Sequence, residues 1–130
     1  MNKEEIIKIL KKYNFDTDKY IVISGASMVL QEIKKQTTDI DIAVDKDYYE
    51  YLLNNYNCIF ERVNEYGINC YMIDNVINFS ETYYDSNYQM IENIKVQDAN
   101  DILKLKQKLK REKDISDIKL LNSYISRNNI

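Results

Sequence analysis

The chain has 130 residues, of which 45% are hydrophobic and 30% are charged, and its net charge is -3. This length suits one domain with its own core, and the lack of a basic excess argues against a protein that coats nucleic acid. The chain has no histidine and only two glycines, which excludes Ser-His-Asp and Cys-His catalysis, a Walker-type phosphate loop and a GxGxxG fingerprint.

The first half of the chain is predicted to alternate helices with strands. Apolar residues at helical spacing indicate the helices, and β-branched runs indicate the strands. The predicted order is a helix over Lys3–Tyr13, a strand over 20–24, a helix carrying Met28, Val29 and Ile33, a strand over Ile40–Val44 and a helix over 46–56. Asp45 or Asp47 is expected near the N-terminal end of the last of these helices, where a carboxylate is favourable.

The second half is predicted to form a meander of antiparallel strands followed by two helices. The strand candidates, joined by the turn sequences NEYG and DN, cover residues 58–63, 68–73 and 76–79. Residues 80–93 show no periodicity and are predicted to be a loop, before a short strand over 94–96. Asp98 and Asp101 suit the start of a helix that reaches Lys110, and Asp114 suits the start of the last helix. We therefore predict a single α+β domain over residues 1–130.

The longest apolar runs are far shorter than a membrane span, and the N-terminal segment is amphipathic without a signal-peptide core. A cytoplasmic protein is therefore expected. Cys58 and Cys70 lie apart among apolar residues without a companion histidine. They are predicted to be buried free thiols, and a disulfide between them is the alternative. Neither is expected to bind a metal.

The stretch TTDIDIAV, residues 37–44, contains two residues that are poorly suited to a strand. Asp39 and Asp41 alternate with Ile40, Ile42 and Val44, so both carboxylates are predicted to lie on one face, about 7 Å apart. Two carboxylates at this spacing can share hard cations such as Mg²⁺. A solvated strand face is the alternative interpretation.

The stretch SGAS, residues 24–27, falls between a predicted strand and a predicted helix. Small residues allow another group to approach the backbone closely, and the N–H groups at a helix start can bind a phosphate. The alternative is an ordinary turn that needs a small residue at Gly25.

Lys106 occupies an unexpected position in the predicted helix that ends at Lys110. On a helical wheel it lies within the arc formed by the apolar residues Ile102, Leu103, Leu105 and Leu109. Its side chain either extends to the surface along its aliphatic stem, or reaches an anionic ligand or one of the two aspartates.

Taken in order, SGAS, TTDIDIAV and the tail DILKLKQKLKREKDISDIKLL resemble the DNA polymerase β-type nucleotidyltransferase superfamily. The resemblance extends from Ile21 to Leu121. It is nearest to small bacterial members, which include antibiotic nucleotidyltransferases and toxin-like proteins of abortive-infection and toxin–antitoxin systems. It implies an α+β fold in which a mixed, mostly antiparallel central sheet is flanked by helices, with two further helices at the C-terminal end.

The resemblance also implies roles for individual residues and for Mg²⁺ and an NTP. The residues implied to bind the nucleotide are Gly25, Ala26, Ser27, Arg111 and Lys113. Asp39 and Asp41 are implied to ligate two Mg²⁺ ions, and Lys106 to stand near the phosphates. Asp114 is expected either to cap the last helix or to take part in catalysis.

One position departs from the superfamily pattern. Active members have a third carboxylate on a later strand, where it binds metal and accepts a proton from the acceptor hydroxyl. In this chain the stretch VINFSE places Asn78 at that position, and an amide is not a useful base. Glu81 or Asp74 takes the position if the strand register is different.

Two functions are therefore expected. The first is transfer of a nucleoside monophosphate from Mg-NTP to a hydroxyl on a small molecule, a protein or a tRNA. The second is a catalytically degenerate binding or regulatory module, for example of a toxin–antitoxin or phage-defence system. The protein is not expected to bind a membrane or to coat nucleic acid. Specificity for the acceptor is expected to come from a protein partner or from a second copy of the chain.

Overall fold

The computed structural model describes residues 1–82 and 84–128. Within these ranges the chain forms five α-helices, one 3-10 helix and seven strands. In chain order they are α1 (Lys3–Tyr13), β1 (Tyr20–Ile23), α2 (Ser24–Leu30), β2 (Ile40–Val44), α3 (Lys46–Asn55), β3 (Cys58–Val63), β4 (Asn69–Ile73), β5 (Ile77–Ser80), β6 (Tyr88–Ile91), β7 (Ile94–Gln97), α4 (Ala99–Leu109), η1 (Glu112–Asp114) and α5 (Ile115–Asn128).

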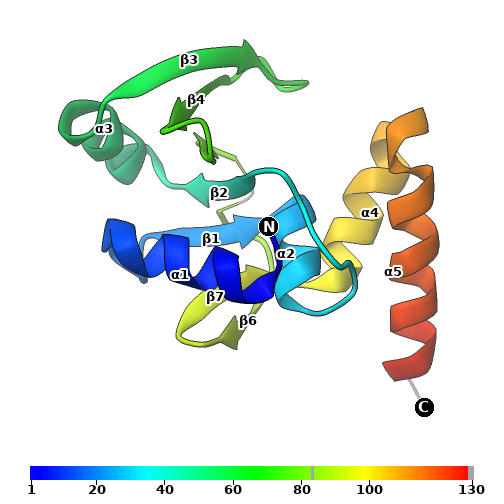
Figure 1. Ribbon diagram of the computed structural model, residues 1–130. Helices are drawn as coiled ribbons and strands as arrows, with labels where there is room; N and C mark the ends of the chain where they lie inside the picture. Colours follow the sequence, from blue (N-terminus) through cyan, green and yellow to red (C-terminus); the bar gives the residue numbers. More distant parts are fainter. Residues whose placement is uncertain (83, 129–130) are drawn as a thin grey trace.

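All seven strands belong to one sheet with the order β3-β4-β5-β2-β1-β7-β6. Two neighbouring pairs, β2 with β5 and β1 with β7, are parallel, and the other four pairs are antiparallel. Figure 1 shows the strands descending from β3 to β6, with α4 and α5 side by side at one end of the sheet. The predicted α+β fold with a mixed, mostly antiparallel sheet and two C-terminal helices is confirmed.

The main core lies on the face of β2 that carries its isoleucines. Ile40 and Ile42 are almost completely buried, and they belong to the same apolar cluster as Leu10 of α1 and Leu52 of α3. Burial of each such side chain stabilises the fold by about 1.5–3 kcal/mol. Because side chains alternate along a strand, Asp41 is directed to the opposite face of the sheet.

Helix α2 ends earlier than the sequence suggests. Glu32 has a φ of 61°, and the Ile33 N–H donates to the carbonyl oxygen of Met28 over 2.9 Å. This is the arrangement of a Schellman cap, which ends a helix and brings an apolar residue back onto it. Ile33 therefore packs in the same cluster as Met28 from outside the helix, and the prediction that it lies within the helix is wrong.

The prediction of a loop over residues 80–93 is wrong for part of that segment. Tyr88–Ile91 forms the edge strand β6, which pairs with β7 through a tight turn at Glu92 and Asn93. Both turn residues have positive φ, 52° and 65°, as a two-residue hairpin turn requires. Residue 83 of the predicted loop lies outside the described residues.

Both cysteines are free thiols, as predicted. Cys70 is buried, whereas Cys58 is only partly so. Among the helices that the structure describes, none has both the length and the apolar character required to cross a lipid bilayer.

Candidate active site

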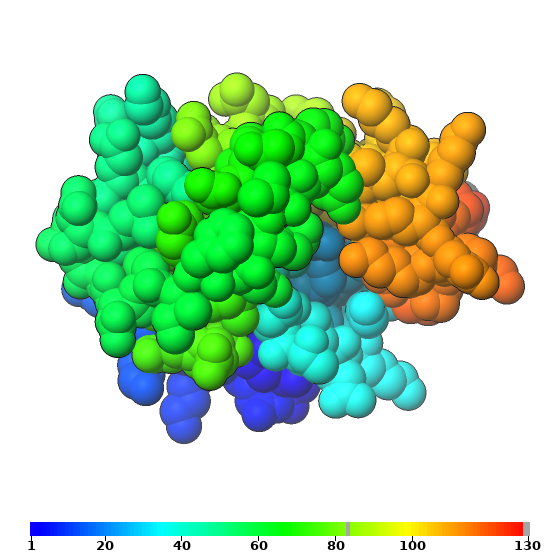
Figure 2. All heavy atoms as spheres, turned by 90° about the horizontal axis from the view of Figure 1, so that it is seen from above, coloured from blue at the N-terminus to red at the C-terminus, as the bar shows by residue number. Residues whose placement is uncertain are grey.

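A cavity of about 70 Å³ lies between the β3–β4 hairpin and α4. Its polar lining includes Asp41, Asn78, Arg62, Glu65 and Arg111. Figure 2 shows the hollow between the green atoms of the hairpin and the orange atoms of the segment near residue 110, with blue atoms at its floor. Pockets that bind drug-sized ligands measure about 300–1,000 Å³, so a whole nucleotide fits only if this cavity widens.

Asp41 lies in the middle of the sheet, at the bottom of this cavity. Its neighbours across the sheet are Ile23 of β1 and Asn78 of β5. Asp39 lies one residue before β2, two positions from Asp41. Within the described residues, neither carboxylate accepts a hydrogen bond or forms an ion pair.

The environment of Asp41 opposes its ionisation. Burial, with smaller contributions from Asp39 and Glu61, raises the pKa of the Asp41 carboxyl from 3.8 to about 7, against the opposing effects of Arg62 and Lys106. Because no group among the described residues donates a hydrogen bond to Asp41, a positive charge bound nearby would stabilise its ionised form.

The donor set fits a hard divalent cation better than a softer metal. Asp41 and Asn78 line the cavity with a carboxylate and an amide, and Asp39 is close enough to raise the pKa of Asp41. Carboxylate and amide oxygens are the ligands that Mg²⁺ prefers. No group of three His, Cys, Asp or Glu side chains within residues 1–82 and 84–128 is arranged to hold a metal ion. A cation at this place would therefore be held by Asp39 and Asp41 with the amide oxygen of Asn78, rather than by three acidic side chains.

Asn78 lies on β5, directly opposite Asp41 of β2. Its Cα pairs with that of Asp41, and its side chain is 6% exposed. Its amide Nδ2 donates a hydrogen bond to the carboxylate of Glu61 on β3. Neither of the alternatives lines the cavity: Asp74 is in the β4–β5 turn, where it accepts a hydrogen bond from Tyr13, and Glu81 lines a separate hollow beyond the end of β2.

The SGAS segment forms a strand-to-helix turn, as predicted, but its residues have different tasks from those expected. Ser24 has a φ of 57° and lines the cavity. At Gly25 a Cβ would stand 3.2 Å from the Thr37 hydroxyl, so the glycine permits a close approach of two chain segments.

Ser27 and Ala26 do not face the cavity. Both are buried, at 0% and 1% exposure. The Ser27 hydroxyl donates to the carbonyl oxygen of Gln97 over 2.8 Å and accepts from Gln31 over 2.9 Å. These contacts occupy the hydroxyl, so the structure contradicts the expected phosphate contact of Ser27 and offers Ser24 in its place.

Lys106 also differs from both expectations. It is 4% exposed, so it does not extend to the surface, and its ammonium contacts Asp114 at 2.9 Å and Asp117 at 3.4 Å. These aspartates belong to η1 and α5, and Lys106 does not line the cavity. Lys106 therefore holds α4 against α5, while its charge also lowers the pKa of Asp41. Its role beside the phosphates stays a prediction.

Asp114 is the centre of this buried network. Its carboxylate accepts from Lys106 and, at 2.6 Å, from Nε of Arg111. Burial raises the pKa of the Asp114 carboxyl, but the hydrogen bonds from Lys106 and Arg111 lower it more, and the net pKa lies below the ordinary value. Asp114 therefore forms ion pairs with Lys106 and Arg111, and no capping hydrogen bond from its side chain to α5 is found among the described residues.

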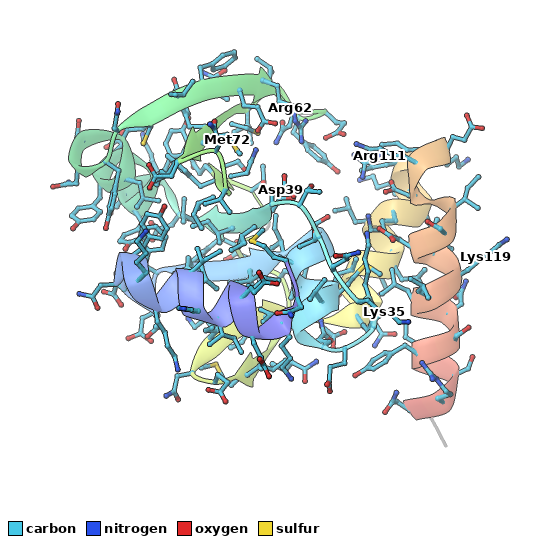
Figure 3. The ribbon with its side chains drawn as sticks, viewed as in Figure 1. Lys35, Asp39, Arg62, Met72, Arg111 and Lys119 are labelled. Carbon is cyan, nitrogen blue, oxygen red and sulfur yellow. The ribbon has the colours of Figure 1, made fainter. Side chains whose placement is uncertain are left out.

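Arg111 joins this network to the cavity, whereas Lys113 is exposed and does not line it. The guanidinium of Arg111 is fixed on one side by Asp114 and contacts Glu65 of the β3–β4 turn at 2.7 Å on the other. Figure 3 shows Asp39, Arg62 and Arg111, from three parts of the chain, around the same opening. The contact between Glu65 and Arg111 therefore bridges the cavity.

Glu65→Gln is expected to loosen this bridge at small cost. The pair is partly exposed, so the free energy of unfolding should fall by less than about 1 kcal/mol. Backbone amides of β3 should nevertheless exchange hydrogen faster, because the hairpin loses its contact with Arg111. Hydrogen exchange followed by mass spectrometry tests this, with Glu50→Gln on the exposed side of α3 as the control. Unchanged exchange in β3 would contradict the bridging role.

Several polar residues that line the cavity were not identified from the sequence, among them Ser24, Arg62 and Glu65. Glu61, which accepts a hydrogen bond from Asn78, was not identified either. The successive charged residues Glu61 and Arg62 were a possible indication of an irregular strand, because in a regular strand they would face opposite sides of the sheet. Here the strand contains a bulge at this point.

The chain was compared with known proteins. The model of a family described as "Nucleotidyltransferase of unknown function (DUF6036)" matches residues 2–127. No curated protein and no solved structure matches the chain.

Proposed function

Because this chain belongs to that family of nucleotidyltransferases of unknown function, we propose that it transfers a nucleoside monophosphate from an Mg-NTP to a hydroxyl acceptor. The observation that carries the proposal is Asp41. It is a partly buried carboxylate without a donor, two positions from Asp39, in a cavity lined by two arginines. A simple solvated strand face would not have a raised pKa.

The side chains of the cavity suit a triphosphate. Arg62 from β3 and Arg111 from the segment between α4 and η1 are the cations of its lining, and Ser24 adds a neutral hydroxyl. Arginine binds phosphate oxygens through several N–H groups at once. Since Asp114 fixes Arg111, its guanidinium would need little reorganisation when a phosphate replaces Glu65.

In this proposal the protein contributes mainly alignment. Asp39 and Asp41 hold the cation site at one fixed place in the sheet, and the arginines orient the phosphates over it. Bound Mg²⁺ neutralises the charge that develops on the α-phosphate and on the leaving pyrophosphate. The acceptor oxygen bonds to the α-phosphorus, the bond from that phosphorus to pyrophosphate breaks, and the acceptor proton leaves to solvent or to a nearby base. The acceptor is a small molecule, a protein or a tRNA.

Asn78 favours a second candidate function. Asn78 lies opposite Asp41, and the resemblance to the superfamily implies a third carboxylate at its position. An amide cannot take the acceptor proton. A module that binds a nucleotide without transferring it, in a complex with a partner protein or with a second copy of the chain, is consistent with this residue.

Binding of a nucleotide is expected to require both the metal and the two aspartates. Isothermal titration with ATP, CTP, GTP and UTP, each with Mg²⁺, should detect binding that Asp39→Ala with Asp41→Ala abolishes. The control replaces two exposed carboxylates, Asp47 and Asp85, with alanine. Absent binding, or binding that is independent of metal and of both aspartates, would contradict the proposal.

The two candidate functions differ in whether a nucleoside monophosphate is transferred to an acceptor. Incubation with NTPs labelled at the α-phosphate and a cell extract should label an acceptor if the chain is an active transferase. Binding without label on any acceptor favours the non-catalytic module.

A further inference from the structure

Glu61 lies at a defect in the strand pairing beside the site. Along β3 the pairing with β4 passes from Phe60 opposite Tyr71 to Arg62 opposite Cys70, so Glu61 is an extra residue. Such a bulge places two successive residues against one partner and changes the direction of their side chains. Both Glu61 and Arg62 are thereby kept on the face of Cys70, which is the face that lines the cavity.

The Glu61 carboxylate meets the side chain of Asn78. Asn78 Nδ2 donates to it, and among the described residues no other group contacts either side chain through a hydrogen bond. An asparagine amide has a donor end and an acceptor end, and its partner decides which way each end points. Because a carboxylate only accepts, Glu61 selects the orientation in which Nδ2 is directed toward β3.

The orientation matters because of the position of Asn78. It stands opposite Asp41 and lines the cavity, and no donor within residues 1–82 and 84–128 binds its Oδ1. If Nδ2 pointed toward Asp41, it would neutralise part of the charge that attracts a cation. With Nδ2 held by Glu61, the end available to the cation is an oxygen.

We propose that Glu61 is a positioning residue that holds the Asn78 amide with Oδ1 toward the cation site, so that Asn78 serves as a neutral ligand in place of a third carboxylate. The inference rests on the proposed function, since it concerns the same site. Outer partners that fix a metal ligand typically change metal affinity by about 10–100-fold when they are removed.

Binding of Mn²⁺ tests this without requiring turnover. Mn²⁺ takes the oxygen ligands that suit Mg²⁺ and is detected directly by electron paramagnetic resonance. Glu61→Gln should weaken Mn²⁺ binding at least tenfold, because a glutamine can also donate and so no longer fixes the amide. Glu50→Gln removes the same charge from an exposed site on α3 and should leave the affinity unchanged.

A double variant in which the donor and the acceptor exchange places should restore Mn²⁺ binding. In Glu61→Gln with Asn78→Asp, the glutamine donates to the new aspartate, and the hydrogen bond is rebuilt with its polarity exchanged. This variant should bind Mn²⁺ at least as tightly as the wild type. Asn78→Asp alone sets two carboxylates against each other and should be less stable than the double variant in thermal unfolding.

The outcomes separate the two proposals. If the wild type binds no Mn²⁺, both the proposed function and the role of Glu61 fail. If the wild type binds Mn²⁺ and Glu61→Gln binds it equally well, only the role of Glu61 fails. A double variant that binds no better than Glu61→Gln alone would also overturn that role.

Discussion

Replacing Lys106 with methionine is expected to lower the free energy of unfolding by about 3–5 kcal/mol. Lys106 is 4% exposed and is the shared cation of Asp114 and Asp117, both of which are buried. Without it, two carboxylates remain close together, and in the described part of the chain Arg111 and Lys34 are the cations left in contact with them. Urea denaturation followed by circular dichroism measures the change.

Lys104→Met provides the control for this prediction. Lys104 is on the same helix but is exposed, so its replacement should change the free energy of unfolding by less than about 0.5 kcal/mol. Adding Asp114→Asn and Asp117→Asn to Lys106→Met should recover part of the lost free energy of unfolding, because the buried carboxylates that Lys106 neutralises are then removed as well. A loss below 1 kcal/mol for Lys106→Met would show that the network is not a stabilising element.

The second large effect is expected from Asp41→Asn, which should stabilise the fold and destroy the cation site together. The pKa of Asp41 is raised to about 7, so the folded state holds a proton that the unfolded state releases near pH 4. The stability associated with this proton is complete below about pH 4 and is lost as the pH rises through 7. At pH 8 the substitution should therefore raise the free energy of unfolding by about 1–3 kcal/mol, a value reduced for solvent screening.

The pH dependence distinguishes this explanation from a general packing effect. At pH 4.5 the stabilisation by Asp41→Asn should be much smaller than at pH 8, whereas Asp47→Asn, an exposed change, should show no such difference. Titration with Mn²⁺ at pH 8 should show at least a hundredfold loss of affinity in Asp41→Asn. Equal stabilisation at both pH values would refute the raised pKa, and retained affinity would refute the role of Asp41.

Local sequence patterns were sufficient where one strand or helix carries the information. The alternation in IDIAV predicts both the core face of β2 and the side on which Asp41 lies. Asn78 was selected through the resemblance to the superfamily, and the structure places it opposite Asp41. The helix bounds of α1 and the capping position of Asp45 are likewise local properties. The mixed sheet followed from the resemblance, which the family match supports.

The errors arise where the answer depends on distant parts of the chain. Lys106 on a helical wheel is compatible with any buried anion, and only the packing of α5 on α4 identifies Asp114 and Asp117 as its partners. Ser27 likewise resembles a phosphate ligand until β7 brings Gln97 against it. The bulge at Glu61 depends on the pairing of two strands, so no property of β3 alone specifies it.

The parallel pairing of β1 with β7 has a consequence for how the chain reaches this state. Val22 pairs with Val96, so β1 has strands on both sides only after most of the chain has been synthesised. Contacts between such distant segments form slowly, because a long loop must close first. All four residues of β1 are buried. A nascent or truncated chain that stops before Ile94 would therefore expose an apolar strand edge to other chains, and would be prone to aggregate before a site could form.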